Sequence, residues 1–176
     1  GVMNTDNMTI SGETIDYGPC AFIDSYDPQA TFSSIDETKR YAFGNQPAIA
    51  QWNLTRLAET LLPLIDADQK TAIAKAEEEL YRFGDVYGES WRAMMRRKLG
   101  LTGQDAQDAA LFEGLLDWMK ERRADYTNTF RALSKPDAGE SLAQEDAAFA
   151  AWRDAWLARR AGVADEQAQR LMSEAN

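Results

Sequence analysis

Residues 68–100 read DQKTAIAKAEEELYRFGDVYGESWRAMMRRKLG, and their pattern is the strongest indication of a mainly helical fold. Apolar side chains recur along it in steps of three and four, from Ile73 to Met94. This spacing is typical of one face of an amphipathic helix. Asp68 is a suitable N-terminal cap and Gly100 a suitable stop, so we expect one long helix here.

Helical patterns also occur on both sides of this stretch. Pro47 suits the first turn of a helix, and apolar residues at helical spacing extend that helix to residue 65. Ser34 with Glu37, and Ser141 with Gln144, resemble helix-capping pairs. Further helices are predicted near residues 104–121, 124–134, 142–161 and 165–174.

The N-terminal part differs from the rest, because residues 1–32 are rich in Asn, Thr, Gly, Asp and Pro. Met8-Thr9-Ile10 and Glu13-Thr14-Ile15 flank the turn dipeptide Ser11-Gly12, a pattern that predicts a short β-hairpin. The expected fold is therefore mainly α, with a short β-hairpin followed by a helical bundle. We expect residues 1–32 and 33–176 to form its two parts.

Composition excludes several classes of function. The net charge of −10 disfavours binding to nucleic acid and to anionic membrane surfaces. No apolar run approaches the roughly 20 residues that span a bilayer. The chain has no histidine and one cysteine, Cys20, so His-based triads, thiolate zinc sites and internal disulfides are excluded. Chemistry would rest on carboxylates, amides and hydroxyls, which suit magnesium, manganese or calcium.

Two oxygen-bearing residues flank the predicted hairpin. Asn7 precedes its first strand and Asp16 follows its second, so the hairpin would bring them close enough to share one metal ion. Protein kinases hold magnesium with such an Asn and with the Asp of Asp-Phe-Gly, and Asp16 begins Asp-Tyr-Gly. A plain loop remains the alternative on this spacing alone. The position of the kinase catalytic Asp, five residues before Asn7, is Val2, and the nearest carboxylate is Asp6.

A calcium-binding loop beginning at Asp6 is excluded by its ligand positions. Met8, Ile10 and Tyr17 occupy the third, fifth and twelfth positions, where oxygen ligands are required.

Several longer motifs occur in a fixed order along the chain. They are Asn4-Thr5-Asp6-Asn7-Met8, Thr14-Ile15-Asp16-Tyr17-Gly18-Pro19, Tyr26-Asp27-Pro28, Arg40-Tyr41-Ala42-Phe43, Asn45-Gln46-Pro47, Trp52-Asn53-Leu54, Arg56-Leu57-Ala58, Met95-Arg96-Arg97-Lys98-Leu99-Gly100-Leu101 and Asp125-Tyr126-Thr127. Together they resemble consecutive landmarks of the selenoprotein O family, and the resemblance covers most of the chain.

This resemblance implies the C-terminal part of a protein-kinase-like pseudokinase fold. Such a protein binds ATP in an inverted orientation and transfers AMP to Ser, Thr or Tyr hydroxyls of other proteins. By position, Asp6 is expected to be the catalytic proton acceptor and Asn7 a ligand of magnesium or manganese. Asp16 is expected to be a second metal ligand that also contacts the nucleotide. ATP and hydroxyl-bearing proteins are the predicted partners, with no nucleic acid and no membrane.

The resemblance also predicts that the chain is an internal fragment of an adenylyltransferase, inactive in isolation. The family's phosphate-binding loop, Lys and Arg residues would precede Gly1. A bacterial cytoplasmic location is expected, or a mitochondrial one in a eukaryote. The alternative function is a non-catalytic helical interaction module.

Two further features have open roles. Arg92, Arg96, Arg97 and Lys98 form a basic cluster that could face phosphate, although a solvated helix face is favoured. Asn53 could make either a structural bond or a substrate contact.

Overall fold

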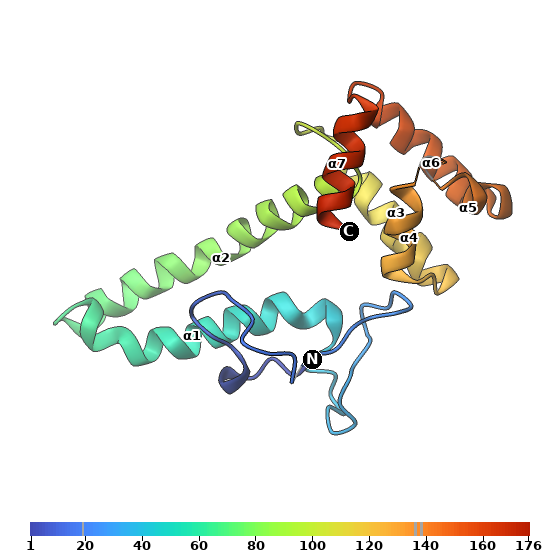
Figure 1. The fold of residues 1–176 in the computed structure, drawn as a ribbon. Helices are drawn as coiled ribbons and strands as arrows, with labels where there is room; N and C mark the ends of the chain where they lie inside the picture. Colours follow the sequence, from blue (N-terminus) through green and yellow to red (C-terminus); the bar gives the residue numbers. More distant parts are fainter. Residues whose placement is uncertain (19, 136, 138) are drawn as a thin grey trace. The chain divides into compact units, whose positions relative to one another are not determined.

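The computed structural model of the chain describes residues 1–18, 20–135, 137 and 139–176, and it is mainly helical (Figure 1). Two single turns of 3-10 helix come first, η1 (Thr5–Asn7) and η2 (Phe43–Asn45). The α-helices of the described residues are α1 (Gln46–Ile65), α2 (Gln69–Lys98), α3 (Asp108–Arg122), α4 (Tyr126–Leu133), α5 (Glu140–Glu145), α6 (Ala147–Arg160) and α7 (Asp165–Ala175).

The predicted β-hairpin is wrong, because the described residues contain no strand and their one β-bridge joins Ser25 to Asp125. Residues 8–16 instead form a loop that bends at Gly12, where φ is +70°. Side-chain hydroxyls of Thr9 and Ser11 accept the backbone N–H groups of Ser11 and Glu13, both at 3.3 Å. Two three-residue strands whose isoleucines, Ile10 and Ile15, are exposed would be marginal in water, and these local bonds replace their ladder.

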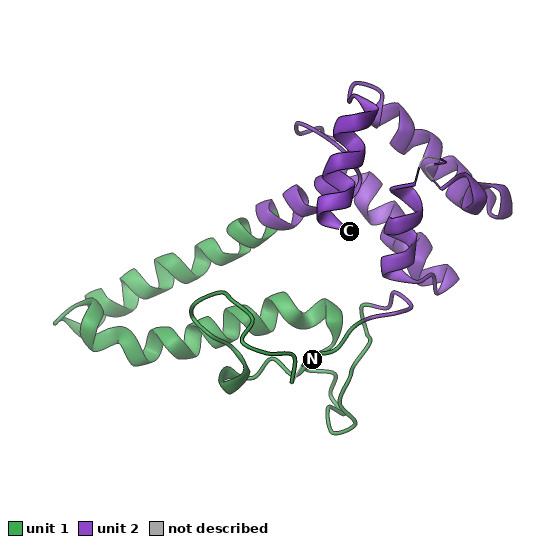
Figure 2. Ribbon diagram, in the orientation of Figure 1, with its two compact units in different colours: residues 1–22, 28–88 green, residues 23–27, 89–176 purple. Residues whose placement is uncertain are grey.

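The chain divides into two compact units (Figure 2). Unit 1 comprises residues 1–22 and 28–88, and unit 2 comprises residues 23–27 and 89–176. The functional division expected at residues 32 and 33 stays a prediction. Pro19, the last residue of the Asp-Tyr-Gly-Pro motif, lies outside the described residues.

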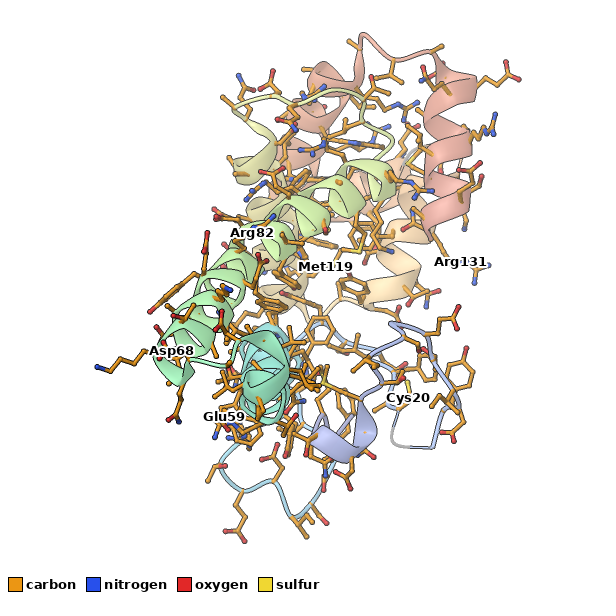
Figure 3. All side chains as sticks on the ribbon, turned by 90° about the vertical axis from the view of Figure 1, so that its left-hand side faces the viewer. Cys20, Glu59, Asp68, Arg82, Met119 and Arg131 are labelled. Atoms are coloured by element: carbon orange, nitrogen blue, oxygen red, sulfur yellow. The ribbon has the colours of Figure 1, made fainter. Side chains whose placement is uncertain are left out.

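Unit 1 is built on α1 and residues 69–88 of α2, which form a helical hairpin (Figure 2). The Gln51 side-chain amide on α1 donates to the Leu80 carbonyl on α2 at 3.1 Å. Asp68 lies in the turn between the helices (Figure 3) and accepts bonds from both the N–H and the hydroxyl of Thr71, each 2.8 Å long. The predicted cap of the long helix is therefore confirmed.

The hydrophobic core that the structure describes lies in unit 2. Its largest fully buried side chains are Trp156, Phe112, Phe130 and Phe149, contributed by α6, α3 and α4. The Trp156 indole also donates to the Leu99 carbonyl at 2.8 Å, which fixes the segment after α2 against α6. Buried aromatic side chains of this size dominate the packing free energy of a small helical unit.

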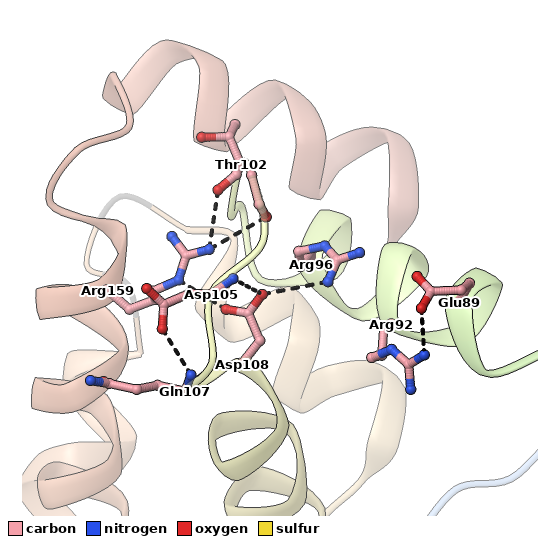
Figure 4. Close-up of polar contacts among 9 residues, drawn as sticks. Glu89, Arg92, Arg96, Thr102, Asp105, Gln107, Asp108 and Arg159 are labelled. Carbon is pink, nitrogen blue, oxygen red and sulfur yellow. Dashed lines mark hydrogen bonds and ion pairs between the residues drawn. The ribbon is translucent and has the colours of Figure 1, made fainter. Parts of the chain in front are cut away.

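A buried carboxylate ties three helices of unit 2 together (Figure 4). Asp108, at the start of α3, is 2% exposed and accepts a 2.9 Å bond from Arg159 Nε on α6. Its other oxygen lies 3.5 Å from Arg96 on α2. Arg159 also donates to the carbonyls of Thr102 and Gly103, so the connecting loop is held in the same network.

Two boundary predictions are wrong for local reasons. The expected helix over 142–161 is broken at Asp146, whose extended backbone ends α5 and whose carboxylate caps the first N–H groups of α6. Ser34 with Glu37 begins no helix, because the Asp36 carboxylate accepts the backbone N–H groups of Arg40 and Tyr41 and holds a series of turns.

Two sequence predictions concern the start of the helix near residues 124–134 and the absence of a membrane-spanning segment. Asp125 accepts the Asn128 N–H at 2.7 Å, so its carboxylate caps α4. None of the described helices combines the length and apolar character needed to cross a membrane.

Candidate functional site

Asp6 and Asn7 lie next to each other on η1, and both are exposed. The Asn7 amide nitrogen donates to the Val2 carbonyl at 2.9 Å, and its backbone N–H donates to the Asn4 carbonyl at 3.1 Å. These bonds fix the side chain while leaving its oxygen, the atom that an Asn offers to a metal ion, outside them. Among the described residues, no hydrogen bond or ion pair engages the Asp6 carboxylate.

Asp16 lies in the exposed loop that follows, four residues before the single cysteine, Cys20, which is labelled in Figure 3. One of its carboxylate oxygens accepts the Gly18 N–H at 2.8 Å, which forms a tight side-chain turn. A Cβ at Gly18 would lie 3.1 Å from that same oxygen, so glycine allows the close approach. The second oxygen of Asp16 is not used by this turn.

The structure gives Asp6 and Asn7 a shared turn, but no described hydrogen bond or ion pair joins either of them to Asp16. No group of three or more Asp, Glu, His or Cys residues that could hold a metal ion occurs among the described residues. Asn7 would supply its amide oxygen and Asp16 its second carboxylate oxygen, which makes two protein oxygens. This donor set fits magnesium, which is usually bound by few carboxylates together with waters and substrate phosphates.

Helix α1 holds the segment that carries η1. Asn53, only 6% exposed, donates its amide to the Met3 carbonyl at 2.8 Å and contacts the Met8 sulfur at 2.6 Å. Gln46, at the start of the same helix, donates to the Gly1 carbonyl at 3.2 Å. The structure therefore gives the Asn53 nitrogen a bond to the polypeptide backbone, the structural one of its two possible roles, and a substrate contact of Asn53 stays a prediction.

A pocket of about 390 Å³ lies between this segment and α1. Thr5, Met8 and Ile10 line it on one side, and Asn53 and Leu57 are among its residues on the helix. It adjoins the Asp6–Asn7 turn, because Thr5 and Met8 are the neighbours of these residues in the chain. Most of its exposed wall is apolar.

The basic cluster at the end of α2 is engaged within unit 2. Arg92 pairs with Glu89, Arg96 with Asp108 and Arg97 with Glu174, while Lys98 donates to the Ala175 carbonyl and to the Asn176 side chain. Burial lowers the pKa of Lys98. The Arg92 and Arg97 pairs are exposed, as expected of a solvated helix face, whereas Arg96 is held in a buried pair.

The sequence left the role of Asn53 undecided and did not single out Gln46, although one signal was present for Asn53. Asn53 lies within the predicted helix 47–65, whose other buried residue is Ile49. A polar residue on the buried side of a helix indicates a hydrogen-bond partner elsewhere. Its partner, Met3, lies 50 residues away in the chain and cannot be named from spacing.

Comparison with known proteins adds a separate observation. The family model described as protein adenylyltransferase SelO matches residues 1–172. A protein of Alkaliphilus metalliredigens named protein nucleotidyltransferase YdiU is 53% identical over all of this chain, which covers 36% of that relative. The proteins of the same name from Brevibacillus brevis and Pelagibacter ubique are 57% and 52% identical over 90% and 100% of the chain. The chain spans about a third of the length of these relatives.

Proposed function

This chain belongs to the protein adenylyltransferase SelO family, and we propose that the complete protein transfers AMP from ATP to Ser, Thr or Tyr hydroxyls of other proteins. The observation that carries the proposal is the turn η1, where the Asp6 carboxylate and the Asn7 oxygen are adjacent and not engaged by the described hydrogen bonds. One can face an acceptor hydroxyl while the other faces a metal ion.

In the proposed reaction, the acceptor hydroxyl oxygen attacks the α-phosphorus of ATP. The bond from that phosphorus to the bridging oxygen breaks, diphosphate leaves, and the hydroxyl proton passes to Asp6. Asn7 and Asp16 would hold magnesium or manganese. Such an ion, when bound, offsets the negative charge of the phosphates during transfer.

The remaining phosphate charge requires cationic groups that the N-terminal segment does not supply. No Lys or Arg occurs before Lys39, whereas Asp6, Glu13 and Asp16 are acidic. The basic cluster of α2 is engaged in unit 2. We therefore expect the chain by itself to transfer no AMP, and the assay is made with the complete protein that contains it.

The test compares transfer of label to protein from ATP carrying it on the α-phosphate and from ATP carrying it on the γ-phosphate. Label from the α-phosphate alone supports AMP transfer, and label from the γ-phosphate alone would make the protein a kinase instead. Asp16→Ala and Asp6→Asn are expected to lower transfer at least 100-fold, since each removes a group acting on the reacting atoms.

Glu13→Gln is the matched control, because it removes an exposed carboxylate from the same loop. It is expected to retain near-normal transfer. An effect of Glu13→Gln as large as that of Asp16→Ala would show that the charge of the loop, and not a metal ligand, is responsible. Absence of label from either ATP with folded protein would favour the helical interaction module.

A further inference from the structure

We infer that Asn53, assisted by Gln46, is a positioning residue that sets the orientation of the Asp6–Asn7 turn through the backbone of residues 1–3. This inference rests on the proposed function, since it assigns these side chains to the same site. Neither side chain need contact substrate or metal for this role.

The turn is closed by one backbone bond of its own, from the Asn7 N–H to the Asn4 carbonyl, and this bond does not fix its position on the protein. The turn is three residues long, none of its residues is buried, and no side-chain bond caps its N-terminus. A single 3-10 turn of this length is weakly stable without outside contacts. Its position must therefore be fixed by the residues on either side of it.

Asn53 contacts both of those sides. Its amide donates to the Met3 carbonyl at 2.8 Å, before the turn, and lies 2.6 Å from the Met8 sulfur, after the turn. Val2, the residue next to Met3, accepts the Asn7 side-chain amide at 2.9 Å. A continuous series of contacts thus leads from the buried Asn53 to the oxygen that Asn7 would present to a metal ion.

Gln46 extends the same attachment. It lies seven residues before Asn53, two helical turns away, and so on the same face of α1. Its side chain donates to the carbonyls of Gly1 at 3.2 Å and Tyr41 at 2.9 Å. Two amides on one helix face therefore hold alternate carbonyls of the segment that leads into the turn.

Helix stability alone does not explain an asparagine at this position. The Asn53 side-chain oxygen is buried and has no hydrogen-bond partner among the described residues. A buried polar atom left unpaired destabilises a fold relative to an apolar side chain of similar shape. The amide nitrogen, which holds Met3, is the part of the side chain with a structural use.

The test uses Asn53→Ala and Asn53→Asp in the complete protein, with Gln51→Ala as the matched control. Asp has the shape of Asn but lacks the amide donor. Gln51 lies on the same helix and also donates an amide to a carbonyl, but that carbonyl belongs to Leu80 on α2. The measurements are AMP transfer as a function of magnesium concentration and hydrogen exchange at the Asn7 backbone N–H.

Both Asn53 variants are expected to raise the magnesium concentration for half-maximal transfer by about 10-fold or more, the usual effect of losing a group that orients a metal ligand. Exchange at Asn7 should also become faster. Gln51→Ala should leave both readouts unchanged. A purely structural defect would reduce the amount of active protein, and hence the maximal rate, without changing the magnesium concentration for half-maximal transfer.

The outcomes separate this inference from the proposed function. Active wild-type protein with an unchanged magnesium dependence in both Asn53 variants would overturn the positioning role and leave AMP transfer standing. An equal shift in Gln51→Ala would also overturn it, since the effect would then belong to α1 as a whole. Wild-type protein without AMP transfer would refute the proposed function and the inference with it.

Discussion

Replacing Asp108 with alanine should raise the population of the open form of unit 2. The increase should be much larger than the one caused by removing an exposed carboxylate from the same helix bundle. Asp108 is 2% exposed and lies between Arg96 and Arg159, whose side chains are only 12% and 13% exposed (Figure 4). Its removal leaves two largely buried guanidinium groups without their carboxylate. Breaking a buried ion pair by removing one partner costs about 3–5 kcal/mol.

The lower end of that range applies to Asp108→Ala. Arg159 keeps its bonds to the Thr102 and Gly103 carbonyls at 3.1 and 3.4 Å, so part of its hydrogen bonding survives. We expect the free energy of opening unit 2 to fall by about 3 kcal/mol, which corresponds to an increase of roughly 100-fold in the population of the open unit. Asp108→Asn retains an acceptor for Arg159, so it should lower the free energy of opening by about 2 kcal/mol, the contribution of one hydrogen bond to a charged group.

The probe is hydrogen exchange at the Trp156 indole, which donates to the Leu99 carbonyl inside unit 2. Glu174→Ala is the control, because it removes a carboxylate 3.4 Å from Arg97 in a pair whose side chains are 53% and 46% exposed. Exposed pairs contribute little and are screened by salt. If Asp108→Ala accelerates indole exchange no more than Glu174→Ala, or if its effect disappears in high salt, the assignment of a buried ionic network is refuted.

Two other predictions concern unit 2. Hydrogen bonds from the Arg122 side chain and from backbone N–H groups of α6 lower the pKa of Asp146 from 3.8 to about 2. The ionised Asp146 carboxylate therefore stabilises the fold above pH 3.8, and this stabilisation is lost as the pH falls through 2. Asp146→Asn should therefore flatten the pH dependence of unfolding free energy between pH 4 and 2, as measured by urea titration. Gly100→Ala should destabilise by about 2 kcal/mol, because φ is +65° and the new Cβ would lie 3.1 Å from Ala168. At Gly103 φ is +66° and a new Cβ would have no atom within 4 Å, so Gly103→Ala should lower the free energy of unfolding by only about 1 kcal/mol. Both variants are measured by thermal unfolding, and equal destabilisation by Gly100→Ala and Gly103→Ala would exclude the contact with Ala168 as the cause.

The helices could be predicted where periodicity and caps agreed. The stripe from Ile73 to Met94, with Asp68 before it, placed α2 close to its observed bounds of Gln69–Lys98. The break at Asp146 was missed because the surrounding alanines favour a helix on either side of it. Its carboxylate caps α6 only after the backbone has left the helical conformation, and propensity does not report that choice.

The candidate site was less predictable than the helices. The motif around Asp6, Asn7 and Asp16 could be singled out, and the roles of these residues stay predictions. The hairpin expected to join Asn7 to Asp16 is absent, because β-prone triplets do not form a ladder when hydroxyls nearby bind the backbone. The attachment through Asn53 depends on a contact across 50 residues, which a single sequence does not reveal.

The side-chain oxygens of Asn7 and Asp16 can be oriented in this segment even though the predicted hairpin does not form. The backbone carbonyl of Val2 binds the nitrogen of Asn7, the one polar atom of that side chain which a metal ion cannot use. The backbone N–H of Gly18 binds one oxygen of Asp16, which restricts the carboxylate and leaves its second oxygen outside the bond. Local bonds to the backbone can therefore orient both side chains without a β-ladder, provided that the segment itself is held in place. That requirement is why the buried amide of Asn53, and not the loop sequence alone, is the feature on which the proposed site depends.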